Sequence, residues 1–439
     1  MPFRIAARRI SLALISISLS LLNGCTTTPH WLAGRATHHR AFIIYWHPPH
    51  GNKDLRLAVK DNIDMQGVVT TAGSEYFAKK HLPAKHDAEC LAIARQSRVV
   101  IVGKTNLSEF AVSPSGINEY FGTPKNPFAG FRRLIPGGSS SGSAEAVASG
   151  LADIAFGTDT AGSIRVPAAC CGIVGLKTTF GLIPLEGVYP IEPHHLDTVG
   201  PLARDIAHTV QGMDLLQSGF SARYQAAVAA KPSAKMIRIG RLNLRNTDPR
   251  IEHAVDDTLA RAGFQVIPLG TDVTAKWEQA KKDGNTVAAS GAWLTNNKYQ
   301  YSLGIAARTR SAILLGRILY PSKYRQALER RAAWQHTLEE VFRKVDFIAL
   351  PTLETLPPII PPSLKLGFLE ALILNRQNTV AVNFAGNPAL ALPIPIHHGS
   401  IPVTSLQLIG PKYSEAELLN AGRMVETSNP RRHFPMMHL

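Results

Sequence analysis

The feature that most constrains this chain is a pair of loops that are built from small residues and lie close together in the sequence. The first loop covers residues 137–143 and the second covers residues 157–163. Between them, residues 144–149 are helical by composition and residues 154–156 are apolar and strand-like. Loops of this kind leave backbone amides free to face a ligand, so the pair predicts a site built partly from main-chain groups.

The surrounding pattern predicts an α/β fold. Residues 55–59 predict a short strand, residues 88–98 a helix and residues 99–102 a buried strand, and this alternation is typical of an α/β sheet. The chain has 439 residues, of which 45% are hydrophobic and 18% charged, so it can bury a large core in one or two domains. Further along, residues 204–344 are mostly helical in pattern, and residues 347–350 predict another strand.

The first loop does not match the common phosphate-binding loops. It lacks the Gly-Lys-Ser/Thr ending of a P-loop, and its glycine spacing does not fit the dinucleotide fingerprint. A plain flexible linker is disfavoured, because the loop lies between a proline-initiated turn and a helix within an apolar stretch. A catalytic or binding loop is therefore the favoured interpretation.

The second loop presents Ser163 after two small residues, which leaves its hydroxyl accessible. A serine hydroxyl becomes a nucleophile only when a base takes its proton. The chain has no G-x-S-x-G elbow and no histidine that stands out by context, so lysine is the remaining base type. Lys60 directly follows an apolar strand, where burial would lower its pKa, although a lysine at a strand end is more often a solvated surface residue.

Several segments together resemble the amidase signature family, and they span most of the chain. They are residues 58–64, 103–110, 136–143, 157–177, 197–202, 351–352, 383–388 and 406–410. The resemblance implies an α/β/α fold with a mixed, twisted sheet covered by helices on both faces. It also implies hydrolysis of a small-molecule or peptide amide without a metal or organic cofactor.

The resemblance further implies a triad of Ser, cis-Ser and Lys. Lys60 takes the position of the base, Ser163 that of the nucleophile, and Ser139 that of the bridge between them, because the family places the bridging serine 24 positions before the nucleophile. The residues implied to supply amides to the oxyanion are Thr160, Ala161, Gly162 and Ser163. The residues implied to pack against the catalytic residues without touching the substrate are Ser140, Asp159 and Arg165, and Asp159 is implied to hold the loop in place.

One position departs from the family pattern. Ala161 stands where the family usually has glycine. If that position requires a positive φ, the methyl group would restrict the backbone and reduce activity.

The N-terminus predicts export. Arg4, Arg8 and Arg9 precede the apolar run of residues 10–22, which is shorter than the roughly 20 residues of a membrane-spanning helix. Residues 22–25 resemble a bacterial lipoprotein box, so we expect Cys25 to carry lipid and to hold the protein at the cell envelope. The expected organisation is a lipoprotein signal peptide at 1–24, a tether at 25–54 and an amidase domain at 55–430.

Composition restricts the partners. The formal net charge is +15, but lysine and arginine are scattered rather than gathered in one tract, so we expect no nucleic-acid partner. The histidine spacing does not resemble a zinc site. Two alternatives stay open: an A-subunit-like glutaminase of a tRNA-dependent amidotransferase, disfavoured by the export signal, and a catalytically inactive envelope binding lipoprotein. The sequence leaves the amide substrate and the oligomeric state undetermined.

Overall fold

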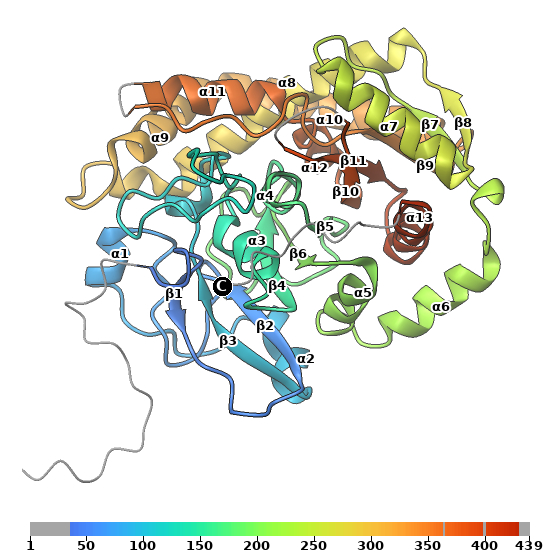
Figure 1. Ribbon diagram of the computed structural model, residues 1–439. Helices are drawn as coiled ribbons and strands as arrows, with labels where there is room; N and C mark the ends of the chain where they lie inside the picture. The colour runs from blue at the N-terminus through green and yellow to red at the C-terminus, as the bar shows by residue number, and fades with distance from the viewer. Residues whose placement is uncertain (1–35, 363–364, 398–400, 430–439) are drawn as a thin grey trace, which may run out of the picture.

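A single mixed sheet organises the part of the chain that the computed structural model describes, which is residues 36–362, 365–397 and 401–429 (Figure 1). Eleven strands form it within these residues. In order across the sheet they are β1 (Phe42–Tyr45), β3 (Val99–Thr105), β2 (Leu55–Lys60), β4 (Ile154–Asp159), β6 (Thr198–Ala203), β5 (Val174–Lys177), β10 (Ala389–Pro395), β11 (Val403–Ile409), β9 (Phe347–Pro351), β7 (Arg238–Arg241) and β8 (Gln265–Pro268).

Two parallel portions flank an antiparallel centre. Strand β2 runs parallel to β3 and β4, and β7 runs parallel to β8 and β9. The neighbours between β4 and β9 pair antiparallel. Parallel neighbours need crossover connections, which explains why helices separate β2 from β3 and β7 from β8 in the sequence.

Helices cover both faces of the sheet (Figure 1). They are α1 (Glu75–Lys80), α2 (Ala92–Gln96), α3 (Ser141–Ala148), α4 (Arg165–Cys171), α5 (Ile206–Asp214), α6 (Phe220–Ala230), α7 (Pro249–Ala262), α8 (Thr271–Asn296), α9 (Ala307–Leu319), α10 (Ser322–Phe342), α11 (Leu366–Arg376), α12 (Val380–Ala385) and α13 (Glu415–Ser428).

Side-chain alternation along the strands explains the two layers. Leu57 and Val59 of β2 point into a core shared with α5, α7 and α13, whereas Ala58 between them points into a core shared with α3 and α4. Small residues on the second face let α3 approach the sheet closely. A third core joins α8, α10 and α12 to β9 and β11. The expected α/β/α fold with a mixed sheet is confirmed.

Most of the predicted elements are present, with changed ends. The strands expected at 55–59, 99–102, 154–156 and 347–350 are β2, β3, β4 and β9. The helix expected at 88–98 is a 3₁₀ turn at Glu89–Leu91 that continues into the short helix α2. Within residues 204–344 the helical prediction missed β7 and β8, because each has only four residues and β8 is exposed along its whole length.

The sheet begins earlier than the sequence suggested. Residues 42–45, expected to belong to a tether at 25–54, form the edge strand β1, which pairs antiparallel with β3. The tether prediction is wrong for these residues, because the Phe42 side chain is completely buried in the core beneath α3. The predicted signal peptide and Cys25 lie outside the described residues. Among the helices that the structure describes, none is long and apolar enough to span a membrane.

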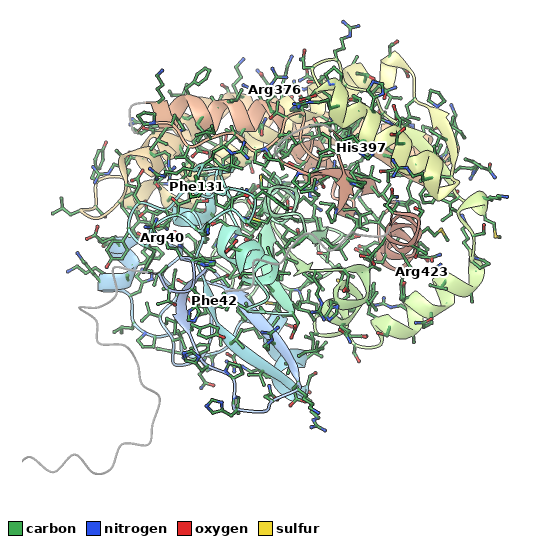
Figure 2. The ribbon with its side chains drawn as sticks, viewed as in Figure 1. Arg40, Phe42, Phe131, Arg376, His397 and Arg423 are labelled. Carbon is green, nitrogen blue, oxygen red and sulfur yellow. The ribbon has the colours of Figure 1, made fainter. Side chains whose placement is uncertain are left out.

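The position of Phe42 gives a test of where the folded domain begins (Figure 2). Phe42→Ala removes a fully buried ring, so we expect the free energy of unfolding to fall by about 3–5 kcal/mol in denaturant titrations. His50→Ala, at an exposed position in the same predicted tether, serves as the control and should leave stability unchanged. Equal, negligible effects of both substitutions would show that residues 42–45 are not part of the domain.

Candidate active site

Lys60 is the last residue of β2 and its side chain is completely buried. Its Nζ atom lies 2.8 Å from Ser139 Oγ and 2.7 Å from Thr158 Oγ1. The Thr158 hydroxyl also accepts a hydrogen bond of 3.1 Å from Asn62 Nδ2, which fixes it in place. The lysine predicted as the base therefore contacts the serine predicted as the bridge.

Burial lowers the pKa of Lys60 to about 7, although the negative charges of Asp159 and Asp197 partly oppose the shift. Among the described residues, no carboxylate lies within ion-pairing distance of its Nζ atom. Lys104 is equally buried but differs in this respect, because its Nζ atom lies 3.0 Å from Asp61 Oδ1. Near neutral pH a large fraction of Lys60 is therefore an uncharged amine that can accept a proton.

A hydrogen bond between Ser140 and Ser163 joins the two small-residue loops. The Gly138–Ser139 peptide bond is cis, as the resemblance implied. The next amide, that of Ser140, donates a hydrogen bond of 3.1 Å to the Ser163 carbonyl. Ser163 itself lies just before α4, is 9% exposed and lines an open cavity. The structure thus brings the three residues of the predicted triad into one place.

Asp159 braces the second loop, as the resemblance implied. Its carboxylate accepts hydrogen bonds from the amides of Gly162 and Ile164 and from two nitrogens of Arg165. Burial alone would raise the pKa of Asp159, but the charge and hydrogen bonds of Arg165 outweigh it and hold that pKa well below its usual range. The loop is therefore held by a permanently charged, buried anchor.

Arg165 connects that loop to the opposite part of the sheet. Its Nη1 atom donates to the Thr379 carbonyl and to Gln407 Oε1, at 3.0 and 2.7 Å, and its Nη2 atom donates to Asn383 Oδ1. The Thr379 hydroxyl in turn donates to the carbonyl of Ala161. The nucleophile loop is therefore fixed from α12 and β11 as well as from β4.

The predicted set of oxyanion donors needs one correction. The Gly162 amide donates to Asp159 Oδ1 at 2.8 Å, so it is committed to the brace and is not free to face a substrate. The backbone amides of Ala161 and Ser163 have no hydrogen-bond partner among the described residues, so they remain free to face a substrate. Thr160 also lines the cavity, and its side-chain hydroxyl donates a hydrogen bond of 2.6 Å to Asp197. The prediction of four substrate-facing amides is therefore wrong for Gly162.

The expected backbone conflict at Ala161 does not arise. The position with a positive φ is Gly162, at 135°, and a Cβ atom there would lie 2.3 Å from Thr379 Oγ1. Ala161 has no positive φ. Because only Gly162 needs the conformational freedom of glycine, the methyl group of Ala161 causes no local strain.

A cavity of about 310 Å³ opens beside Ser163. Its walls come from the nucleophile loop, from the residues after the 3₁₀ turn at Glu109–Ala111, and from α8, α9 and α11. The apolar lining is supplied mainly by Ala111, Val112, Ile191, Ala288, Ala289, Ala292, Ala312, Leu315, Leu319, Ala371 and Leu374. The cavity is thus an apolar compartment that ends at the predicted nucleophile.

The family model and the similar proteins that match this chain point to the same family. The amidase family model matches residues 54–419. The A subunit of the glutamyl-tRNA(Gln) amidotransferase of Halobacterium salinarum is 33% identical over 410 residues, covering 84% of this chain and 94% of that protein. A 2-amino-5-chloromuconic acid deaminase of Comamonas testosteroni is 31% identical over 395 residues, covering 85% and 81%. The chain belongs to the amidase signature family.

A solved structure agrees with this membership. The crystal structure of the A subunit of the glutamyl-tRNA(Gln) amidotransferase from Thermotoga maritima is 25% identical and superimposes with a TM-score of 0.71, over 89% of this chain and 88% of that one. Members of the amidase family are therefore similar to this chain across nearly its whole described length.

Sequence reasoning missed several polar residues that complete this amidase site. Thr158 contacts the base, Asp197 holds Thr160, and Thr379 holds the Ala161 carbonyl. Asp197 precedes the buried strand β6, so a polar residue at the start of an apolar run was the available signal. Thr379 lies more than 200 residues from Ala161 and gave no local signal at all.

Gly162 has a positive φ and Ala161 does not, and this difference gives a test of the backbone conformation of the nucleophile loop. Gly162→Ala forces a methyl group against Thr379, so we expect a serine-directed fluorophosphonate to label the protein about 10²-fold more slowly, as is typical when a reacting atom shifts by about 1 Å. Ala161→Gly should label at the wild-type rate. Labelling that is slowed by Ala161→Gly and unaffected by Gly162→Ala would contradict this account of the backbone.

Proposed function

We propose that this amidase family member hydrolyses an uncharged carboxamide through an acyl-enzyme on Ser163, with Ser139 as the proton bridge and Lys60 as the base. The single observation that carries the proposal is the contact of 2.8 Å between Ser139 Oγ and a fully buried lysine that has no carboxylate partner among the described residues. A buried lysine without a counter-ion is costly as a cation, so its neutral form is available for proton transfer.

The first half of the reaction forms the acyl-enzyme. Neutral Lys60 donates one hydrogen to Thr158 Oγ1, which leaves its lone pair directed at the Ser139 hydroxyl. Ser139 gives its proton to Lys60 and takes the proton of Ser163, whose oxygen attacks the amide carbon. The amides of Ala161 and Ser163 stabilise the resulting oxyanion. The proton then returns along the same path to the leaving amine as the C–N bond breaks.

The second half releases the product. Water gives a proton to Ser139, whose own proton passes to Lys60, and the resulting hydroxide attacks the acyl carbon. Collapse of the second tetrahedral intermediate breaks the bond to Ser163 Oγ, which recovers its proton from the bridge. The carboxylic acid leaves, and each proton taken up by Lys60 has been returned, so the cycle needs only water as co-substrate.

The cavity favours an uncharged substrate over glutamine. Among the described residues that line it, none is aspartate, glutamate, lysine, arginine or histidine. Two cations that do not line the cavity share one carboxylate: Lys281 Nζ lies 2.9 Å from Glu354 Oε1, and Arg376 Nη1 lies 3.3 Å from Glu354 Oε2. Glutamine carries an ammonium and a carboxylate, which this apolar compartment would leave without ionic partners. The cavity therefore supports an amidase acting on neutral amides rather than a glutaminase.

The triad predicts a defined pH dependence of serine labelling. Because only neutral Lys60 accepts a proton, the rate of fluorophosphonate labelling should fall about tenfold per pH unit well below pH 7 and reach a plateau above about pH 8. Peptide mapping should place the label on Ser163, and Ser163→Ala should not be labelled. A rate that is flat with pH, or a label on another serine, would overturn the assignment.

Lys177 provides the matched control for that pH profile. It is as buried as Lys60, and burial, followed by the charge of Arg165, lowers its pKa to about 7 as well, but its Nζ atom donates to the carbonyls of Thr178 and Asn387. Lys60→Ala should label slowly and lose the dependence on pH near 7. Lys177→Met should keep that dependence, because Lys177 does not touch either serine.

We also propose that the N-terminus anchors the protein at the cell envelope through lipid on Cys25. The support is the order of charged, apolar and lipobox-like residues between Arg4 and Cys25. Cys25→Ser should abolish labelling by radioactive palmitate in cells and move the protein from the membrane fraction to the soluble fraction. Cys90→Ser, which changes a buried cysteine, should leave lipid labelling intact. Unchanged labelling of the Cys25→Ser variant would defeat the proposal.

A further inference from the structure

The cavity beside Ser163 contains a buried glutamine whose amide has no partner. Gln377 is 1% exposed and lines the cavity, and its Nε2 atom makes no hydrogen bond to any residue that the structure describes. A buried amide without a partner is rare in native proteins and costs stability comparable to a lost hydrogen bond. Its place in a cavity that ends at the predicted nucleophile suggests that a substrate supplies the partner.

Hydrogen bonds hold the backbone around Gln377, which fixes the point from which its side chain extends. The Gln377 amide N–H donates to the Ile373 carbonyl at 2.9 Å, and the residue forms an isolated bridge with Leu353. The next residue, Asn378, is tied to the carbonyls of Pro351 and Thr352 at the end of β9, both at 3.0 Å. Two residues after Gln377, Thr379 holds the nucleophile loop. The same short segment therefore carries the loop and the unpartnered amide.

A second carboxamide faces the same cavity from α8. Asn285 lines the cavity, and its Oδ1 atom is buried without a hydrogen-bond partner among the described residues. One carboxamide here leaves a donor unused and the other leaves an acceptor unused. Each side chain offers both a donor and an acceptor, so together they complement a group that also has both. An amide is a neutral group that carries its donor and its acceptor on separate atoms, as these two carboxamides require, and the remaining lining is mainly apolar.

We propose that Gln377 and Asn285 are specificity-determining residues that select substrates carrying a second, neutral amide group in an otherwise apolar acyl chain. This inference rests on the proposed amidase function. A second amide satisfies the unpartnered Gln377 Nε2 and Asn285 Oδ1 atoms, whereas a purely apolar acyl chain leaves both without a partner. A charged group in the same place is excluded because no described residue lining the cavity carries an opposite charge.

The test compares 4-nitroanilides that have the same shape but different polarity. N-acetylglycine and 4-methylpentanoic acid anilides differ in that the first carries an amide where the second carries apolar atoms. N-acetyl-β-alanine anilide moves the amide one methylene further, and succinic acid monoanilide replaces it with a carboxylate. We expect kcat/KM of the wild type to be about tenfold higher for the better of the two acetylated substrates than for 4-methylpentanoyl, with the carboxylate substrate lowest.

Variants separate substrate selection from structure. Gln377→Met keeps the length of the side chain and removes its amide. The ratio of kcat/KM for the acetylated substrate to kcat/KM for the 4-methylpentanoyl substrate should therefore fall from about ten to about one, while the 4-methylpentanoyl substrate is still hydrolysed. Gln300→Met is the matched control, because Gln300 also has a buried amide atom without a partner but does not line the cavity, and it should keep the preference. The melting temperature of Gln377→Met should be unchanged or raised, since the variant removes a buried polar group.

The outcomes distinguish this inference from the proposed function. If the wild type cleaves the acetylated and 4-methylpentanoyl anilides equally, or cleaves none of them although Ser163 is labelled by fluorophosphonate, the proposed selection is wrong and the triad stands. If Gln377→Met retains the preference, or melts several degrees lower, Gln377 has a structural role and the inference is overturned. If Ser163 is not labelled at all, the proposed function fails and this inference fails with it.

Discussion

The buried pair of Asp159 and Arg165 is the interaction on which the arrangement of the site depends. A carboxylate and a guanidinium taken fully out of water are tolerated only when each is paired and its remaining hydrogen-bonding groups are satisfied. Asp159 meets this requirement with the amides of Gly162 and Ile164, and Arg165 meets it with Thr379, Asn383 and Gln407. Satisfying the two charges therefore determines the path of the nucleophile loop and joins β4 to α12 and β11. The loop takes its shape from this electrostatic need and not from its own weakly structured, small residues.

Four buried lysines in this protein have different hydrogen-bond partners and therefore different roles. Lys104 and Lys281 each lie about 3 Å from a carboxylate, which keeps the pair together as a structural contact. Lys177 donates to two backbone carbonyls and links β5 to the segment before β10. Lys60 instead contacts two hydroxyls, and burial lowers its pKa to about 7. Burial lowers the pKa of Lys177 to about 7 as well, but its backbone-carbonyl partners have no proton to exchange. Of these four lysines, only Lys60 combines an accessible neutral amine with a serine hydroxyl that can exchange a proton with it.

The sequence could predict the residues whose signal is local. The strands that end at Lys60 and Asp159 are short apolar runs, and the loops around Ser139 and Ser163 are marked by glycine and serine, so both the sheet and the centre of the site could be located. The edge strand β1 could not, because its burial depends on α3, about 100 residues further along the chain. Two hydrogen bonds could not be predicted either, because they depend on backbone conformation and on contacts between distant segments. The Gly162 amide donates to the Asp159 carboxylate, and the Thr379 hydroxyl donates to the Ala161 carbonyl. A pattern in one sequence carries no information about such contacts.

The contrast between residues with a local sequence signal and residues placed by distant contacts explains why family membership says more about the reaction than about the substrate. The groups proposed to move protons lie at strand ends and in loops fixed by the sheet, where the amidase family pattern is recognisable. The wall of the cavity comes largely from α8, α9 and α11, and α8 and α9 lie in the stretch 204–344, which contains none of the segments on which the family resemblance rests. Helices that pack on a rigid sheet can exchange their lining residues without disturbing the charges and hydrogen bonds that hold the nucleophile. A relative can therefore share the sheet, the loops and the buried pair and still act on a different amide, so the name of a relative that is 33% identical does not determine what this cavity accepts. The polarity of the cavity lining is the more direct guide, because it acts on the substrate itself.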